Sequence, residues 1–175
     1  MPKHFLKRRS IIAAAVLGVV AALSVGLAAA TVNPASAPSG THFATGSTEP
    51  VCTVNPDQSV SCTGTTLGGV GHTNATVLLV ASYSGTVNCY NPDGHLVESH
   101  TTTFSTSSSA TATSTKNGQL TIPSRNSVSP TSVPQTCPNP NWTPRFAPGS
   151  PTLTSFTYTV TFAGFTGPYI TVTGP

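Results

Sequence analysis

TLTSFTYTVTF, residues 152–162, alternates apolar side chains with serine and threonine along most of its length. In an extended chain this period of two predicts a β-strand with one buried face and one solvated face. The side chains on the apolar face are Phe156, Tyr158, Val160 and Phe162. A turn with two glycines and a proline then leads to YITVT, in which Ile170 and Val172 continue the apolar face. Residues 152–173 are therefore predicted to form a β-hairpin.

A second hairpin is predicted around the NPDG turn inside residues 74–104. Proline and aspartate suit the middle of a type I turn, and the glycine suits the left-handed position that follows it. The expected cross-strand pairs are Cys89 with Val97 and Tyr90 with Leu96. The strand before the turn also contains Gly85, where we expect a bulge or a kink.

The composition predicts an all-β fold. Only 6% of the residues are charged, and threonine, serine, glycine and proline are abundant, which excludes a helical bundle. Residues 38–175 are predicted to form one domain with a single core. Residues 105–118 are expected to be a solvated edge strand or a loop, and 119–122 a short strand. Prolines exclude a central strand from residues 124–151, so we expect a long ordered loop there, which is a candidate binding surface.

Residues 1–37 are predicted to be a signal peptide and a short linker, which would place the domain outside the cytoplasm. Four basic side chains precede an uncharged apolar run over residues 11–30, and small residues follow it. Cleavage after Ala30 and cleavage after Ala37 both suit a signal peptidase, and Pro38 just beyond the second site favours the first. The apolar run is also long enough to span a bilayer, so an uncleaved membrane anchor is the alternative.

The charge distribution excludes nucleic acid as a partner. Beyond residue 30 the chain carries three basic and four acidic side chains, so the +3 net charge of the whole chain comes from the N-terminal segment. Nucleic-acid binding needs a basic stripe that replaces phosphate counterions, and this domain has no such stripe.

Cys52 and Cys62 enclose a turn sequence in CTVNPDQSVSC. If residues 56–58 form the loop, the two cysteines face each other across a hairpin at a separation that a disulfide can bridge. A redox motif needs cysteines that are closer in sequence, and structural zinc needs two close pairs, so a disulfide is the better interpretation. A bond between these two cysteines would leave Cys89 to pair with Cys137.

Four segments, VCTVNPDQSVSCTGTTLGGVG, VNCYNPDG, KNGQL and CPNPNWT, resemble signature segments of small secreted proteins common in filamentous actinobacteria. The resemblance covers most of residues 50–145. It implies the 52–62 and 89–137 disulfides and an antiparallel β-sandwich, immunoglobulin-like or related. Those proteins are exported β-domains without an assigned biochemical role, and the resemblance supplies no catalytic residues.

The sequence contains no pattern typical of a catalytic or metal site. Acid–base catalysis needs two placed carboxylates, or a histidine with a partner. Asp57 and Asp93 are explained by their turns, and Glu98 is expected to face solvent. His95 and His100 would point to opposite faces of a strand, so they cannot bind one metal together. We therefore predict a protein that is not an enzyme and has no cofactor.

Trp142, with Arg145 close by, is the strongest candidate for a binding residue. An exposed tryptophan on a rigid loop stacks on a sugar ring or anchors a protein contact, whereas a packed tryptophan would anchor the loop itself. We predict a secreted structural or interaction module at or beyond the cell surface, with a carbohydrate-binding module as the alternative. The expected partners are a cell-wall polysaccharide or a surface protein, and a membrane only if the N-terminal segment stays uncleaved.

Overall fold

The computed structural model describes residues 27–127, 130, 132–134 and 136–175. These residues form antiparallel strands and a short 3-10 helix, η1 (Pro34–Ser36), which confirms the all-β prediction. Most of the predicted signal segment lies outside the described residues.

The largest sheet is built around one long strand, β7. β8 pairs with one side of β7, while β12 and then β11 pair with its other side, and β13 and β2 follow β12. The strands of this sheet are β2 (Ala30–Val32), β7 (Ala75–Tyr90), β8 (Leu96–Ala112), β11 (Thr143–Phe146), β12 (Thr152–Phe162) and β13 (Ile170–Gly174).

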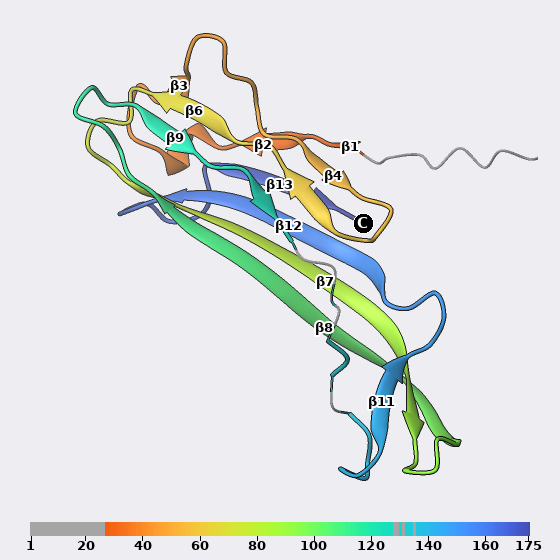
Figure 1. Cartoon of the computed structure of the whole chain (residues 1–175). Coiled ribbons are helices and arrows are strands. Elements are labelled where there is room, and N and C mark those ends of the chain that lie inside the picture. Colours follow the sequence, from red (N-terminus) through yellow and green to blue (C-terminus); the bar gives the residue numbers. More distant parts are fainter. Residues whose placement is uncertain (1–26, 128–129, 131, 135) are drawn as a thin grey trace, which may run out of the picture.

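Two smaller sheets lie over part of the large sheet (Figure 1). The first contains β1 (Leu27–Ala28), β4 (Cys52–Val54), β5 (Val60–Cys62) and β10 (Arg125–Asn126). The second contains β3 (His42–Phe43), β6 (Thr65–Gly68) and β9 (Leu120–Ile122). Buried side chains from all three sheets form one core cluster, which includes Val60, Leu67 and Tyr158. Each large apolar side chain buried there contributes roughly 1.5–3 kcal/mol, so this shared core holds the layers together.

The predicted C-terminal hairpin is confirmed. β12 and β13 pair in register from Phe156 with Gly174 to Val160 with Ile170. The apolar positions of β12 from Phe156 onward are buried, as are Ile170 and Val172 in β13, and the hydroxyl-bearing positions are exposed or half-buried. The hairpin joins the large sheet because β12 also pairs with β7.

The hairpin closed by Cys52 and Cys62 is also confirmed. The two residues pair across β4 and β5 with their Cα atoms 4.0 Å apart, and their sulfur atoms are bonded. In the turn, Gln58 adopts a left-handed φ of 67°. Its Oε1 accepts a hydrogen bond from the N–H of Leu153 at 2.9 Å, and its carbonyl accepts one from the hydroxyl of Tyr83 at 3.2 Å. These bonds fasten the turn to β12 and β7.

β7 and β8 form one long hairpin, and the bulge that was one of two expectations at Gly85 is wrong. The two strands keep a constant register from Ala75 to Cys89. Gly85 is closely packed, because a Cβ there would lie 3.2 Å from the Cβ of Pro151 and 3.3 Å from Cε1 of Phe146, which is tighter than most contacts of a Cβ.

The irregularity of this hairpin lies next to its turn. Tyr90 pairs with Leu96, as predicted. Cys89 pairs with Glu98, and the predicted pairing with Val97 is wrong. Val97 is therefore the extra residue of a β-bulge, which the turn sequence alone does not indicate.

Residues 105–118 and 124–151, the low-complexity and Pro-rich segments, both contain β-strands. β8 continues to Ala112, so residues 105–112 form the solvated edge strand that was one of two expectations. β9 matches the short strand predicted at 119–122. Residues 124–151 are not one continuous loop, because they contain β10 and β11. β11 contains Pro144, which an edge strand tolerates and a central strand does not.

Residues 27–37, ahead of the predicted domain, take part in the sheets. β2 pairs with β13, and β1 pairs with β4. η1 follows β2, and Ala37 directly after η1 is buried, with 7% of its surface exposed.

Candidate functional site

The β7–β8 hairpin continues past the small sheets as an arm (Figure 1). Near its end, β11 takes the place of β12 as the neighbour of β7. The NPDG turn closes the arm, because Asn91 accepts hydrogen bonds from the N–H of Gly94 at 2.9 Å and, through Oδ1, from the N–H of His95 at 2.8 Å. We call residues 87–100 together with 136–146 the arm end.

One face of the arm end carries an apolar and cationic surface. Cζ of Arg145 lies 5.2 Å from the centre of the Tyr90 ring, which is a cation–π contact. Leu96 is paired with Tyr90 and therefore lies on the same face, with 54% of its surface exposed. The bulged Val97 is 44% exposed, and no other large hydrophobic side chain in the described part of the chain is exposed. We call the three residues of this face, together with the adjacent Val97, the tip surface.

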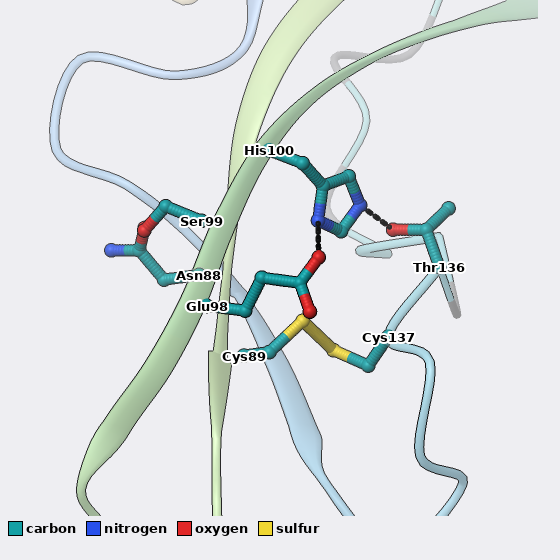
Figure 2. A network of polar contacts seen from close by, with 7 residues as sticks. All are labelled: Asn88, Cys89, Glu98, Ser99, His100, Thr136 and Cys137. Atoms are coloured by element: carbon teal, nitrogen blue, oxygen red, sulfur yellow. Dashed lines mark hydrogen bonds and ion pairs between the residues drawn. A yellow bond between two sulfur atoms is a disulfide. The ribbon is translucent and has the colours of Figure 1, made fainter.

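The opposite face carries the Cys89–Cys137 disulfide and a row of polar side chains (Figure 2). The disulfide joins residues 48 positions apart and confirms the predicted pairing. Beside it, Nε2 of His100 lies 2.7 Å from Oγ1 of Thr136, and Nδ1 lies 3.7 Å from Oε1 of Glu98. The disulfide and the His100–Thr136 hydrogen bond together fasten the segment before β11 to both strands of the arm.

Strand alternation keeps the two faces apart. Asn88 and Ser99 pair directly across the hairpin, and the Ser99 hydroxyl donates to Oδ1 of Asn88 at 2.6 Å. Figure 2 shows this pair on the other side of the strands from the disulfide. A cross-strand hydrogen bond of this kind contributes roughly 0.2–1 kcal/mol and holds the two strands in register below the tip surface.

The polar row has the order hydroxyl, imidazole, carboxylate, which is also the order of a nucleophilic triad. Its spacing differs from that of a triad, because 3.7 Å between Nδ1 of His100 and Oε1 of Glu98 is longer than a hydrogen bond. Nδ1 has no hydrogen-bond partner in the described part of the chain, so no contact fixes the tautomer that would accept a proton from Thr136. These contacts account for the position of the segment and give it no evident means of activating a nucleophile.

Both predicted binding residues lie in the arm end. Arg145 is exposed on β11, and Trp142, immediately before β11, is half-buried. A half-buried indole is compatible with a stacking platform and with a loop anchor, so both interpretations remain. Tyr90, Leu96 and Val97 were not predicted as site residues. The available signal was an aliphatic pair two residues after the turn glycine, in a position where polar residues are usual.

Away from the arm end, the environment of Asp57 changes the pKa of its carboxyl group. The hydroxyl of Ser59 donates to Oδ1 of Asp57 at 2.6 Å, and the N–H of Ser59 donates to the same oxygen at 3.0 Å. These two hydrogen bonds lower the pKa of Asp57, and they explain this residue as part of the turn. Within the described residues, no three His, Cys, Asp or Glu side chains gather in a way that could hold a metal ion.

Comparison with known proteins gave no match to a family model, to a curated protein or to a solved structure. In the portion of the chain that the structure describes, no helix is long and apolar enough to cross a membrane. The function is therefore inferred from the arm end itself.

Proposed function

We propose that this protein is a secreted, non-enzymatic interaction module that binds a surface protein, at or beyond the cell surface, through the tip surface of its arm. The observation that carries the proposal is the exposure of Leu96 and Val97 at the end of the arm, 54% and 44% respectively. Burying apolar surface contributes about 25 cal/mol per Å², so both side chains favour a covered state. Tyr90 and Arg145 beside them are residue types that often dominate protein interfaces.

The backbone beneath the tip surface is held in place before any partner arrives. β11 pairs with residues 87–90 of β7, and the Cys89–Cys137 disulfide anchors the chain that leads into β11. A surface that is ordered in advance loses less conformational entropy on binding, so more of the contact energy becomes affinity.

Two disulfides indicate that the protein folds in an oxidising compartment. We infer export as the route to that compartment, and the N-terminal segment supports this. We also infer an immunoglobulin-like or related β-sandwich, which is supported by sheets in two layers around one core. The resemblance to small secreted proteins of filamentous actinobacteria is in line with both inferences.

Carbohydrate binding through Trp142 is the second candidate function. It is supported by the position of a half-buried indole at the arm end, where one ring face could stack on a sugar of a cell-wall polysaccharide. Tyr90 is a poorer platform, because the guanidinium of Arg145 already lies over its ring.

A double substitution, Leu96→Ser with Val97→Ser, tests the primary proposal. Both side chains are exposed, so we expect the melting temperature to change by no more than about 2 °C. Capture of the immobilised protein's partner from a cell-surface protein fraction should be lost. Thr101→Ser with Thr103→Ser, two exposed positions farther along β8, is the matched control and should capture as the wild type does. Undiminished capture by the tip variant would contradict the proposal.

Trp142→Ala separates the two candidates. If the protein binds carbohydrate, this variant should lose retention on insoluble cell-wall polysaccharide and keep its melting temperature, while the tip variant should still be retained. If Trp142 anchors the loop, its loss should lower the melting temperature.

A further inference from the structure

We propose that the exported chain is cut by a membrane-bound peptidase between Ala30 and Thr31, so that β2 remains as the first strand of the mature protein. The sequence pattern allows a cut after Ala30 or after Ala37. The structure separates the two sites by what each cut would remove from the fold. This inference concerns processing, so it does not depend on the arm end.

A cut after Ala37 would remove a segment that is built into the fold. β2 supplies three paired positions to β13, and removal would leave that edge of the sheet without a partner. Val32 packs against the core cluster, and Ala37 is part of it. The side-chain and backbone bonds that would be lost include Asn33 N–H to the Tyr169 carbonyl at 2.8 Å and Ser36 hydroxyl to the Thr166 carbonyl at 3.2 Å.

A cut after Ala30 keeps nearly all of these contacts. It removes the two residues of β1, one pair of the β2–β13 ladder, and the packing of Ala28 and Ala30 against the core. Thr31 remains paired with Thr171, and Val32 with Ile170.

The new chain end also fits the ladder. Asn33 donates its N–H to the carbonyl of Tyr169, directly before β13, and in an antiparallel ladder the residue two positions earlier points its N–H the same way. The nitrogen of Thr31 therefore faces the Thr171 carbonyl. After the cut this nitrogen is an α-ammonium group that still donates there, as a charge-assisted hydrogen bond. Thr31 is exposed, so the new charge keeps its contact with water.

The local sequence suits a peptidase that recognises small side chains at the residue before the cut and two residues earlier, here Ala30 and Ala28. Thr31 follows the cut, whereas the other site is followed by Pro38, whose ring restricts the backbone. One water is consumed. The C–N bond between Ala30 and Thr31 breaks, the water oxygen enters the Ala30 carboxylate, and its two hydrogens complete the Thr31 ammonium.

Export of the full chain from a secreting bacterial host, followed by intact-mass and N-terminal peptide analysis of the released protein, tests the proposal. We expect a chain that begins at Thr31. Ala30→Phe should leave the protein uncut and cell-bound. Ala35→Phe alters the alternative site at an exposed position, and its product should still begin at Thr31.

Val32→Ser provides a readout that does not depend on mapping the terminus. If β2 is retained, this variant should lower the melting temperature of the released protein by several degrees, because the side chain packs against the core. A released chain that begins at Pro38, an uncut chain, or a melting temperature unaffected by Val32→Ser would each overturn the proposal.

Discussion

Tyr158 shows how a single buried residue limits stability. Its side chain is fully buried on β12, yet its hydroxyl has no hydrogen-bond partner in the described part of the chain. An unpaired buried hydroxyl costs about 1–3 kcal/mol. Burial raises the pKa of this phenol to about 12, with the charge of Arg125 acting in the opposite direction. Folding therefore favours the protonated form, and stability should fall as the pH rises from about 10 through 12.

We expect Tyr158→Phe to melt at the same temperature as the wild type or a few degrees higher, because it removes only the unpaired hydroxyl. The variant should also lose less stability as the pH rises from about 10 to 12, as followed by circular dichroism. Tyr90→Phe, at the half-buried ring of the arm end, is the control and should keep the alkaline loss of the wild type. A lower melting temperature for Tyr158→Phe would mean that the hydroxyl makes a stabilising hydrogen bond, and would contradict this prediction.

The residue scale also shows what the sequence can and cannot indicate. Buried positions such as Val160 and Val172 follow from strand alternation, which depends on neighbours in the chain alone. The pairing of Leu96 with Tyr90 was predicted from the turn, but the exposure of Leu96 was not. Its exposure arises because the small sheets do not extend over the arm end, and that depends on contacts between distant parts of the chain.

The two disulfides stabilise different parts of the molecule. Loop length alone predicts that the 89–137 bond contributes more to stability than the 52–62 bond. In the chain-entropy model the 52–62 bond contributes about 2.7 kcal/mol and the 89–137 bond about 4 kcal/mol. Cys52 and Cys62 lie in the core cluster, whereas Cys89 lies outside it, in the arm end. Removal of the 89–137 bond therefore also frees a segment of the folded protein. The conformational entropy that this segment gains offsets part of the stability that the bond contributes.

We expect Cys52→Ala with Cys62→Ala to lower the melting temperature by about 5–10 °C while the folded protein still binds through its tip surface. Cys89→Ala with Cys137→Ala should retain a cooperative melting transition and lose most of the binding. Calorimetry and the capture assay measure the two effects. Equal binding by the arm variant would show that the disulfide does not position β11.

At the scale of elements, the sequence predicted most strands and which of their faces are buried. It did not predict the position of the bulge or the strand β11. The hairpin has its bulge at Val97 and none at Gly85. The residues packed closely against Gly85 are Pro151 and Phe146, which are far away in sequence and which the local pattern does not indicate. β11 was missed because its proline argues against a strand. It forms where the disulfide brings the chain beside the end of β7.

At the scale of the whole molecule, the chain divides into a layered body and an arm with little core of its own. The single core cluster contains the body positions of β7 up to Tyr83, but it does not include Val87 or Cys89, although both are buried. Composition and periodicity predicted an all-β domain with one core. They could not predict that the core ends partway along the β7–β8 hairpin, because the alternation of side chains in β7 continues beyond that point.

This division predicts two levels of stability within one pair of strands. Amides in residues 75–83 are covered by the small sheets and should exchange with solvent only through global unfolding, while those in residues 87–100 can open locally with the arm end. Hydrogen exchange with peptide-level mass spectrometry should therefore show slower exchange in the first segment. Cys89→Ala with Cys137→Ala should speed exchange in the second segment and leave the first unchanged. Equal protection along the whole hairpin would mean that arm and body unfold as one unit, because the ladder between β7 and β8 would then suffice to couple them without a shared core.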